Sequence, residues 1–130
     1  MMKLLSPALA AALTVFLSSP SCAAHPGQVQ TGIASYYHDS LHGNRTASGQ
    51  IYDKNKLSAA HKTLPLGSRV RVTDKRTGKS VVVHVNDRGP FIKGRIIDLS
   101  RRAARELGII RRGITPVRVE VLSVAGRRGA

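Results

Sequence analysis

Three acidic side chains in this sequence stand where a carboxyl group could do chemistry. Asp53 and Asp87 lie in irregular segments beside apolar runs, and Asp98 ends a short apolar run just before a predicted helix. A positioned carboxyl group can donate or accept the proton that moves when a covalent bond is cleaved. We expect Asp98 to accept hydrogen bonds at the start of the helix, which leaves the roles of Asp53 and Asp87 open.

The segment Asn-Asp-Arg-Gly-Pro-Phe (86–91) is the most distinctive in the chain, because its polar residues, glycine and proline directly follow a valine-rich run. Such segments at strand ends often carry function. A purely structural interpretation is open for both carboxylates. Asp87 could accept backbone N–H bonds in a tight Gly89-Pro90 turn, and Asp53 could form an Asx turn before Lys54.

Two histidines, His38 and His42, stand four residues apart, the spacing that lets two imidazoles on one helix face bind a metal. Gly43 and the polar composition around it favour a loop instead of a helix. We therefore expect no metal site in this segment, and nothing in the sequence points to a cofactor.

The elements that must position these residues are mostly strands. The clearest are two alternating, β-branched runs, 68–73 and 79–86, joined as a hairpin with Gly78 in the turn. Their valines are predicted to face the core, which places Arg69 and Arg71 on the opposite face.

Weaker patterns predict the remaining elements. Strands are expected at 32–37, 95–98 and 115–122, a loop at 38–49, a helical turn at 58–61, and a helix from the cap Ser100 to Gly108. Many short strands with glycine-marked turns and one or two short helices predict a mainly β domain, a small closed β-barrel.

The first 24 residues differ from the rest and read as a signal peptide. Lys3 precedes an apolar run from Leu4 to Leu17, too short to span a membrane, and small residues follow it. The single cysteine, Cys22, stands where a lipid anchor could be attached, although an ordinary cleavage site fits equally well. We expect a linker at 25–30, one domain at 31–122 and a disordered tail at 123–130.

The chain carries a formal net charge of +14, with 21 Lys and Arg against 7 Asp and Glu. Such a field attracts any polyanion, so nucleic acid and an anionic polymer outside the cytoplasm are the two candidate partners. Export and the few aromatic residues argue against nucleic acid. A third interpretation, that the charge only keeps the protein soluble, stays open.

Several motifs occur in order along the chain. They are GIASYY (32–37), TASGQIYD (46–53), LSAAHKTLPLG (57–67), RVRVT (69–73), SVVVHVNDRGPF (80–91), GRIIDLS (94–100) and VRVEVL (117–122). Together they resemble the rare lipoprotein A (RlpA) family of septal-ring lytic transglycosylases over about residues 31–122. The resemblance implies a six-stranded double-psi β-barrel with a substrate groove across it, preceded here by the signal peptide.

The resemblance also implies an activity, which is cleavage of peptidoglycan between N-acetylmuramic acid and N-acetylglucosamine to leave 1,6-anhydro ends. The implied substrate is glycan lacking stem peptides, whose free lactyl carboxylates would suit a basic groove. Asp87, Asp53 and His61 fall on the family's candidate catalytic positions. Gln50 stands where the family most often has glutamate, and because an amide cannot transfer a proton we expect it to bind sugar hydroxyls.

Further expectations follow from the same resemblance. Asp87 is expected to donate the proton first and could then act as the base for the C6 hydroxyl of the muramic acid. Arg88, Tyr36 and Tyr37 are expected to contact substrate, although core packing would explain at least one tyrosine equally well. The protein is expected to act as a monomer in the periplasm or at the outer membrane. The alternative is a non-catalytic, expansin-like wall-binding or wall-loosening protein, which Gln50 favours somewhat.

Overall fold

The computed structural model describes residues 23–125. The predicted signal peptide, including Cys22, therefore lies outside the described residues except for its last two positions. The described elements are β1 (Val29–Tyr36), the 3-10 helix η1 (Asp39–Leu41), β2 (Ser58–His61), β3 (Arg69–Asp74), β4 (Ser80–Asp87), β5 (Arg95–Leu99), α1 (Arg101–Leu107) and β6 (Thr115–Ser123). None of these helices is long and apolar enough to cross a bilayer.

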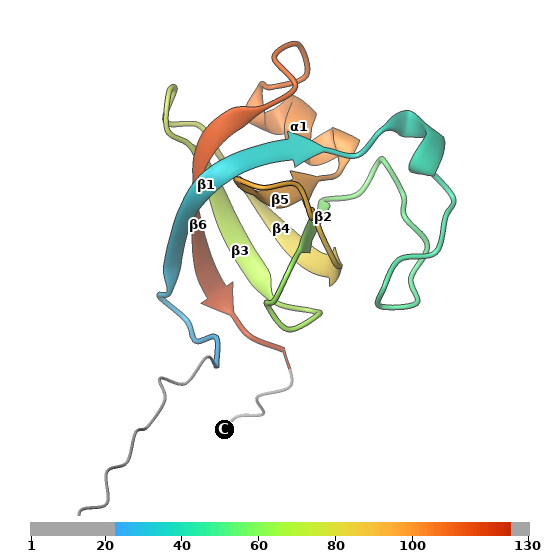
Figure 1. The fold of residues 1–130 in the computed structure, drawn as a ribbon, viewed down its shortest axis with the longest axis horizontal. Helices are drawn as coiled ribbons and strands as arrows, with labels where there is room; N and C mark the ends of the chain where they lie inside the picture. The colour runs from blue at the N-terminus through green and yellow to red at the C-terminus, as the bar shows by residue number, and fades with distance from the viewer. Residues whose placement is uncertain (1–22, 126–130) are drawn as a thin grey trace, which may run out of the picture.

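The six strands close into a barrel in the order β1-β5-β2-β4-β3-β6. The pairs β1–β5 and β2–β4 are parallel, and the other neighbouring pairs are antiparallel. Figure 1 shows the strands wrapping around one axis, with α1 at one end of the barrel. The predicted six-stranded double-psi β-barrel is therefore confirmed.

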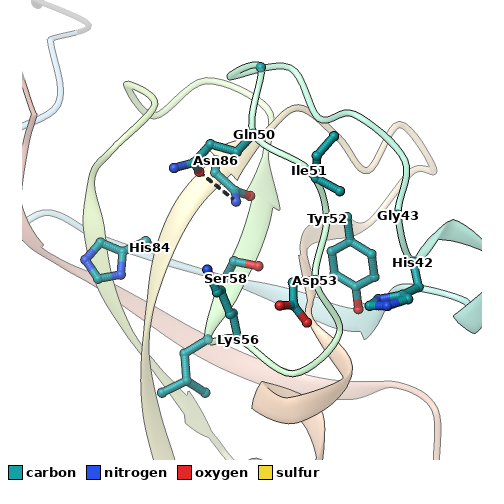
Figure 2. Close-up of a pocket in the computed structure, with 12 residues that line it drawn as sticks. His42, Gly43, Gln50, Ile51, Tyr52, Asp53, Lys56, Ser58, His84 and Asn86 are labelled. Carbon is teal, nitrogen blue, oxygen red and sulfur yellow. Dashed lines mark hydrogen bonds between the residues drawn. The ribbon is translucent and has the colours of Figure 1, made fainter.

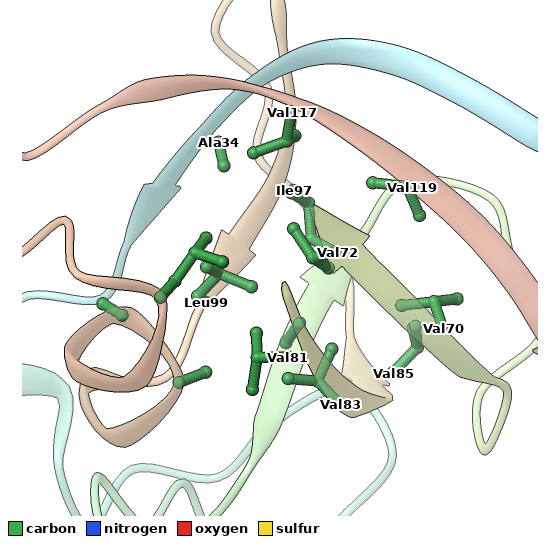
Figure 3. Close-up of a cluster of buried hydrophobic side chains, with 14 of the residues drawn as sticks. Ala34, Val70, Val72, Val81, Val83, Val85, Ile97, Leu99, Val117 and Val119 are labelled. Carbon is green, nitrogen blue, oxygen red and sulfur yellow. The ribbon is translucent and has the colours of Figure 1, made fainter. Parts of the chain in front are cut away.

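Valines from the β3–β4 hairpin fill the barrel, as their alternation predicts. Val70 pairs with Val83, and Val72 pairs with Val81. All four side chains are buried. Figure 3 shows them converging with Val117 and Val119 of β6. Burial of each such side chain stabilises the fold by roughly 1.5–3 kcal/mol, so the interior supplies most of the stability of the barrel.

The α-helix begins and ends where its capping residues predict. The Ser100 side chain accepts a hydrogen bond from the Ala103 N–H, and Gly108 ends the helix in the left-handed conformation at φ 83°. Ala103, Ala104 and Leu107 are buried in the barrel core. The helix thus closes the end of the barrel at which β5 arrives.

The helical turn predicted at 58–61 is wrong, because these residues form β2. All four side chains are buried, and the strand lies between β4 and β5. A strand there satisfies its backbone N–H and C=O groups on both sides, which a helical turn could not do. Tertiary pairing overrides the weak local preference of two alanines.

The predicted domain boundaries are too narrow at both ends. β1 begins at Val29, so the last two residues of the predicted linker belong to the barrel, and the Gly27 N–H donates to the Val121 carbonyl at 2.8 Å. β6 extends to Ser123, the first residue of the predicted tail. Residues 126–130 of that tail lie outside the described part of the chain.

The connection from β1 to β2 is a long loop, as predicted, and it lies beside the barrel (Figure 1). Two hydrogen bonds close it on itself: the Gly43 N–H donates to the Tyr52 carbonyl at 2.9 Å, and the Tyr52 N–H donates to the Asn44 carbonyl at 2.7 Å. Residues of this loop also belong to the candidate functional site.

Candidate functional site

Two carboxylates lie on either side of one alanine across three neighbouring strands. Asp87 of β4 and Asp98 of β5 are both register partners of Ala60 on β2, and Asp98 is also the partner of Ser35 on β1. Neighbouring strands are about 4.8 Å apart, so the Cα atoms of the two aspartates are separated by roughly 10 Å. We call this set (Ser35, Asp98, Ala60 and Asp87) the acid row.

The acid row lies on the outer face of the barrel. Ile97 and Leu99, on either side of Asp98, belong to the barrel core, so the strand alternation turns Asp98 outward. Ala60 packs with Tyr37 and Tyr52 in a second, smaller cluster under the long loop. Both aspartates are half-buried residues, unlike the fully buried Ala60 between them.

Three donors hold the Asp87 carboxylate. The Tyr37 hydroxyl donates to Oδ2 at 2.5 Å, and the backbone N–H groups of Ala47 and Arg88 donate to Oδ1 at 2.8 and 2.9 Å. Only one of these donors comes from its own turn, because Ala47 and Tyr37 reach it from the long loop and from the end of β1. A carboxylate that accepts three hydrogen bonds is well suited to the ionised form.

Tyr37 is fixed in turn by stacking. Its ring lies 4.3 Å from the ring of Tyr52, with 14° between their planes. Burial, reinforced by the hydrogen bond to Asp87, raises the pKa of Tyr37 well above its usual value. The hydroxyl therefore stays protonated and remains a donor to Asp87 at any physiological pH.

Asp98 lies in a different environment. Its carboxyl group accepts a hydrogen bond from the Ser35 hydroxyl. Burial raises the pKa of Asp98, and this outweighs the opposing effects of Ser35 and Arg95. The predicted role of Asp98 at the helix start is wrong, because Ser100 caps α1. The sequence did contain a signal for this position. Because Asp98 stands between Ile97 and Leu99 in a strand, alternation alone predicts that its side chain points away from the core.

His61 is almost fully buried, with 3% of its surface exposed. Its Nδ1 atom accepts hydrogen bonds from the N–H groups of Thr63 and Leu64, so Nε2 carries the proton and donates to Gln30 Oε1 at 2.8 Å. Burial, with smaller effects from Arg88 and Lys62, lowers the pKa of His61 to about 4. The ring is therefore neutral near pH 7 and both its nitrogens are occupied.

Arg88 does not pair with its neighbour Asp87 through its guanidinium group. That group donates instead to the carbonyl oxygens of His61 at 3.1 Å and Leu64 at 2.7 Å. It thereby joins the segment after β4 to the end of β2. Among residues 23–125, no arginine side chain forms an ion pair with the Asp87 carboxylate.

A cavity of about 900 Å³ lies between the long loop and β4, and we call it the amide cavity. It is lined by His42, Gly43, Gly49, Gln50, Ile51, Tyr52, Asp53, Lys56, Leu57, Ser58, His84 and Asn86. A smaller hollow of about 280 Å³ adjoins it and shares Gln50, His84 and Asn86. Figure 2 shows Tyr52 and Asp53 on one side of the amide cavity and His84 on the other.

Gln50 and Asp53 line the amide cavity, whereas Asp87 and His61 are not among its lining residues. Gln50 Oε1 accepts a hydrogen bond from Asn86 Nδ2 at 3.1 Å (Figure 2). Asp53 Oδ1 accepts one from the Asn55 N–H at 2.8 Å, which is an Asx turn. The two regions meet at consecutive residues of β4, because Asn86 lines the amide cavity and Asp87 belongs to the acid row.

The aromatic residues are arranged differently from the sequence prediction. Tyr36 is half-buried and donates its hydroxyl proton to the Ile110 carbonyl at 2.8 Å, whereas Tyr37 is buried and stacks inside the second cluster. Phe91 is 77% exposed and Ile92 56% exposed, just after Asp87 in the chain. Sequence reasoning did not assign Phe91 a role, although its place in the 86–91 segment was the available signal.

The family described as lytic transglycolase matches residues 29–119, from the first residue of β1 into β6. The chain belongs to this family. The predicted resemblance to the RlpA proteins is confirmed by two curated relatives. The "Endolytic peptidoglycan transglycosylase RlpA" of Pasteurella multocida is 58% identical over 98 residues, which are 75% of this chain and 33% of that protein. The "Probable endolytic peptidoglycan transglycosylase RlpA" of Synechocystis sp. is 49% identical over 116 residues, which are 88% of this chain and 36% of that protein.

The chain thus spans about a third of the length of these curated relatives. Solved structures share its barrel. The Streptomyces papain inhibitor aligns with a TM-score of 0.61 at 26% identity, over 75% of this chain and 96% of that one. An apo expansin of Clavibacter michiganensis aligns with a TM-score of 0.59 at 22% identity, over 73% of this chain and 50% of that one, and shows the fold alone.

Proposed function

We propose that this barrel is an endolytic transglycosylase that cleaves peptidoglycan glycan between N-acetylmuramic acid and N-acetylglucosamine. The observation that carries the proposal is the acid row, in which two half-exposed carboxylates stand on either side of a small alanine on one face of the barrel. Glycosidic cleavage requires a proton for the leaving oxygen and a negative group near the sugar cation. The names of the RlpA relatives support the same reaction.

In this reaction the C6 hydroxyl of the muramic acid residue is the nucleophile. Its oxygen attacks C1 of the same sugar, the bond from C1 to the leaving oxygen breaks, and a 1,6-anhydro end forms without consuming water. Asp87 is placed to accept the proton of the C6 hydroxyl, because three donors hold both of its carboxyl oxygens in a fixed position. His61 and Arg88 position the segment that carries Asp87.

The proposed substrate is glycan stripped of stem peptides. Each muramic acid in such a strand carries a free lactyl carboxylate, and the net charge of +14 attracts a polyanion of this kind. The amide cavity adds local recognition, since Lys56 supplies a cation, and Gln50 and Asn86 supply amide groups that can bind sugar hydroxyls. Asp53 lines the same cavity and binds substrate there in this proposal.

This function places the protein outside the cytoplasm, where peptidoglycan lies. The sequence of residues 1–24 supports export, and attachment of lipid at Cys22 would hold the protein at the outer membrane. Metabolic labelling with a fatty acid, followed by the same labelling of Cys22→Ala, distinguishes the anchored product from a free periplasmic one.

A second function, non-catalytic binding to the cell wall, is favoured by Gln50. This residue replaces the glutamate most common in the family, and the amide cavity that it lines does not include Asp87. A binding protein would adhere to the same glycan and leave it uncut. The nature of the product therefore separates the two functions.

The test is digestion of glycan strands lacking stem peptides, followed by mass spectrometry of the fragments. We expect anhydro-muramyl ends from the wild-type protein and a loss of about 10²- to 10⁴-fold in rate for Asp87→Asn, the usual contribution of a positioned acid or base. Glu106→Gln is the matched control, because this carboxylate lies on the surface of α1 beside Arg102. Reducing ends would indicate a hydrolase, and intact strands that stay bound would indicate the binding function.

A further inference from the structure

We propose that Asp98 is the catalytic acid that protonates the leaving oxygen of the N-acetylglucosamine residue. This inference rests on the proposed function and completes it, because Asp87 accepts a proton in that reaction and a second group must donate one. Nothing in the sequence pattern assigns this role to Asp98. The geometry of the acid row points to it.

The first argument is position. Asp98 and Asp87 share Ala60 as register partner, so they stand on two strands on either side of β2 and on the same outer face. Ala60 contributes only a methyl group between them. Ala60 itself is buried under Tyr37 and Tyr52, whereas the two aspartates on either side of it are partly exposed. A sugar ring bound at the edge of this cluster would meet two separate carboxyl groups, as a reaction with one proton donor and one proton acceptor requires.

The second argument is the contrast between the two environments. Asp87 accepts hydrogen bonds from one hydroxyl and two backbone N–H groups, whereas the only hydrogen bond recorded for the Asp98 carboxyl among residues 23–125 comes from Ser35. Burial raises the pKa of Asp98, and the negative charge of Asp87 raises it further. Three donors make Asp87 an acceptor site, whereas burial favours the neutral, proton-donating form of Asp98. Two carboxyl groups in such different environments are the usual signature of an acid and base pair.

The charged and titratable groups around Asp98 come from three elements. Asp87 faces it from β4 and Tyr37 from the end of β1, while Arg95 lies on its own strand, β5. On β2 the register partner is Ala60, which cannot ionise. Arg95 and Ser35 favour the ionised form of Asp98, and burial and Asp87 favour the neutral form.

The third argument is that Gln50 cannot supply the proton. Its amide does not titrate, and its Oε1 is held by Asn86 in the amide cavity. His61 is also unsuited, since it is buried and both ring nitrogens are bonded within the protein. With Gln50 and His61 excluded and Asp87 accepting a proton, Asp98 is the candidate that can donate one.

The proton balance of the step is simple. The Asp98 carboxyl gives its proton to the leaving oxygen as the bond from C1 breaks, and Asp87 takes the proton of the C6 hydroxyl as that oxygen bonds to C1. At the end of the step Asp98 is ionised and Asp87 is protonated. Transfer of one proton from Asp87 to Asp98, through solvent, restores the starting state.

The direct test is Asp98→Asn on glycan strands lacking stem peptides. Asparagine keeps the size of the side chain and its oxygen can still accept the Ser35 hydrogen bond, so we expect a folded protein that binds glycan with unchanged affinity. The rate of release of anhydro ends should fall at least 100-fold at every pH. A rate within threefold of wild type would overturn the inference.

Ser35→Ala gives a second test that keeps the carboxyl group. The Ser35 hydroxyl stabilises the ionised form of Asp98, so its removal should move the basic limb of the profile of kcat/KM against pH upward by about one pH unit, the size expected for one hydrogen bond to a charged group. The acidic limb should stay in place, because the Ser35 side chain bonds to Asp98 and not to Asp87. Ser80→Ala, the same change at an exposed position at the start of β4, is the control.

These tests separate the two proposals. If the wild-type protein releases no anhydro ends from these strands, both proposals fail. If the wild type is active and Asp98→Asn is also active, only the role of Asp98 fails. If Asp98→Asn does not fold, the Ser35→Ala profile decides: a shifted basic limb supports the acid role, and an unshifted one assigns Asp98 a structural role and overturns the inference.

Discussion

The acid row and the amide cavity share the long loop and the end of β4, yet they differ in how their polar side chains are held. In the acid row each polar group is fixed by partners within the protein, as when Tyr37 and two backbone N–H groups hold Asp87. In the amide cavity Gln50 and Lys56 are exposed, and the recorded contact of Asn86 is with Gln50 itself. A region that moves protons gains from fixed geometry, whereas a region that binds a flexible glycan gains from side chains that can rearrange.

The comparison predicts different consequences of substitution in the two regions. Changes around the acid row should alter stability, kcat and the pH dependence. Changes in the amide cavity should alter KM while leaving kcat and the fold nearly intact. The predictions below are ordered by the size of the expected effect.

The largest effect concerns His61, which supports the acid row from the end of β2. The unfolded chain takes up a proton at this histidine below about pH 6.5, whereas the folded protein does so only near the lowered pKa of about 4. The free energy of unfolding should therefore fall as the pH drops through this window, by about 3 kcal/mol in all. Urea unfolding at pH 7 and at pH 4 measures this loss.

His61→Asn isolates the contribution of His61. Its side-chain oxygen can accept from the Thr63 and Leu64 N–H groups as Nδ1 does, but it does not titrate. The raised pKa of Asp98 acts in the opposite direction at low pH, and it is present in both proteins, so it cancels in the difference. The variant should lose much less stability than wild type between these pH values, and His84→Asn, at an exposed position on β4, should behave as wild type. Equal slopes for wild type and His61→Asn would contradict the assignment.

Tyr37→Phe tests the fixed geometry of the acid row. The variant loses the hydroxyl that donates to Asp87 Oδ2 and keeps the ring that stacks on Tyr52. A hydrogen bond to a charged group contributes about 2 kcal/mol, so we expect a fall of about 30-fold in kcat with little change in KM. Steady-state kinetics on glycan strands lacking stem peptides measures both parameters.

Tyr52→Phe is the matched control within the same stacked pair. The Tyr52 hydroxyl accepts a hydrogen bond from the Arg101 N–H at the start of α1, away from Asp87. Its removal should lower the free energy of unfolding by about 1 kcal/mol and leave kcat unchanged. If both variants lose kcat equally, the Tyr37 hydroxyl acts only through the packing of the cluster.

The barrel itself could be predicted from the sequence because its signals are local. The alternating valines of the hairpin, the Ser100 cap and Gly108 each define their own element. β2 could not be predicted in the same way, since Ser58–His61 becomes a strand only through pairing with β4 and β5. Its sequence of small residues carries no periodic signal, and long-range pairing decides its structure.

The candidate site was predicted only in part, and for a related reason. The 86–91 segment identified Asp87 by its composition, but the partnership of Asp87 with Asp98 depends on a register across three strands. The contacts of this strand end with the long loop, in which Ala47 bonds to Asp87 and Gln50 to Asn86, likewise depend on the fold. Neither relation is contained in a linear motif.

Lys56→Gln tests the amide cavity. Its exposed ammonium group is proposed to attract the lactyl carboxylate, and an exposed ion pair contributes up to about 1 kcal/mol. The variant should therefore raise KM for strands lacking stem peptides by up to about fivefold, with kcat unchanged. Binding of a neutral chitin oligosaccharide, which lacks the lactyl group, should not change. A loss of affinity for both ligands would place Lys56 in general sugar binding.

The smallest effect is expected for Gln50→Glu, which restores the residue most common in the family. The two side-chain contacts recorded for Gln50 Oε1 are both with donors, Asn86 Nδ2 and the Ser48 hydroxyl, so a glutamate oxygen can keep them. If Asp98 supplies the proton, a new carboxyl group in the amide cavity is not needed for the reaction, and kcat should change by no more than about twofold. Kinetics of Gln50→Glu in the wild-type and Asp98→Asn backgrounds checks this. A gain of tenfold or more in the single variant, or recovery of activity in the double variant, would show that the two regions share one proton-transfer site and would remove the distinction between them.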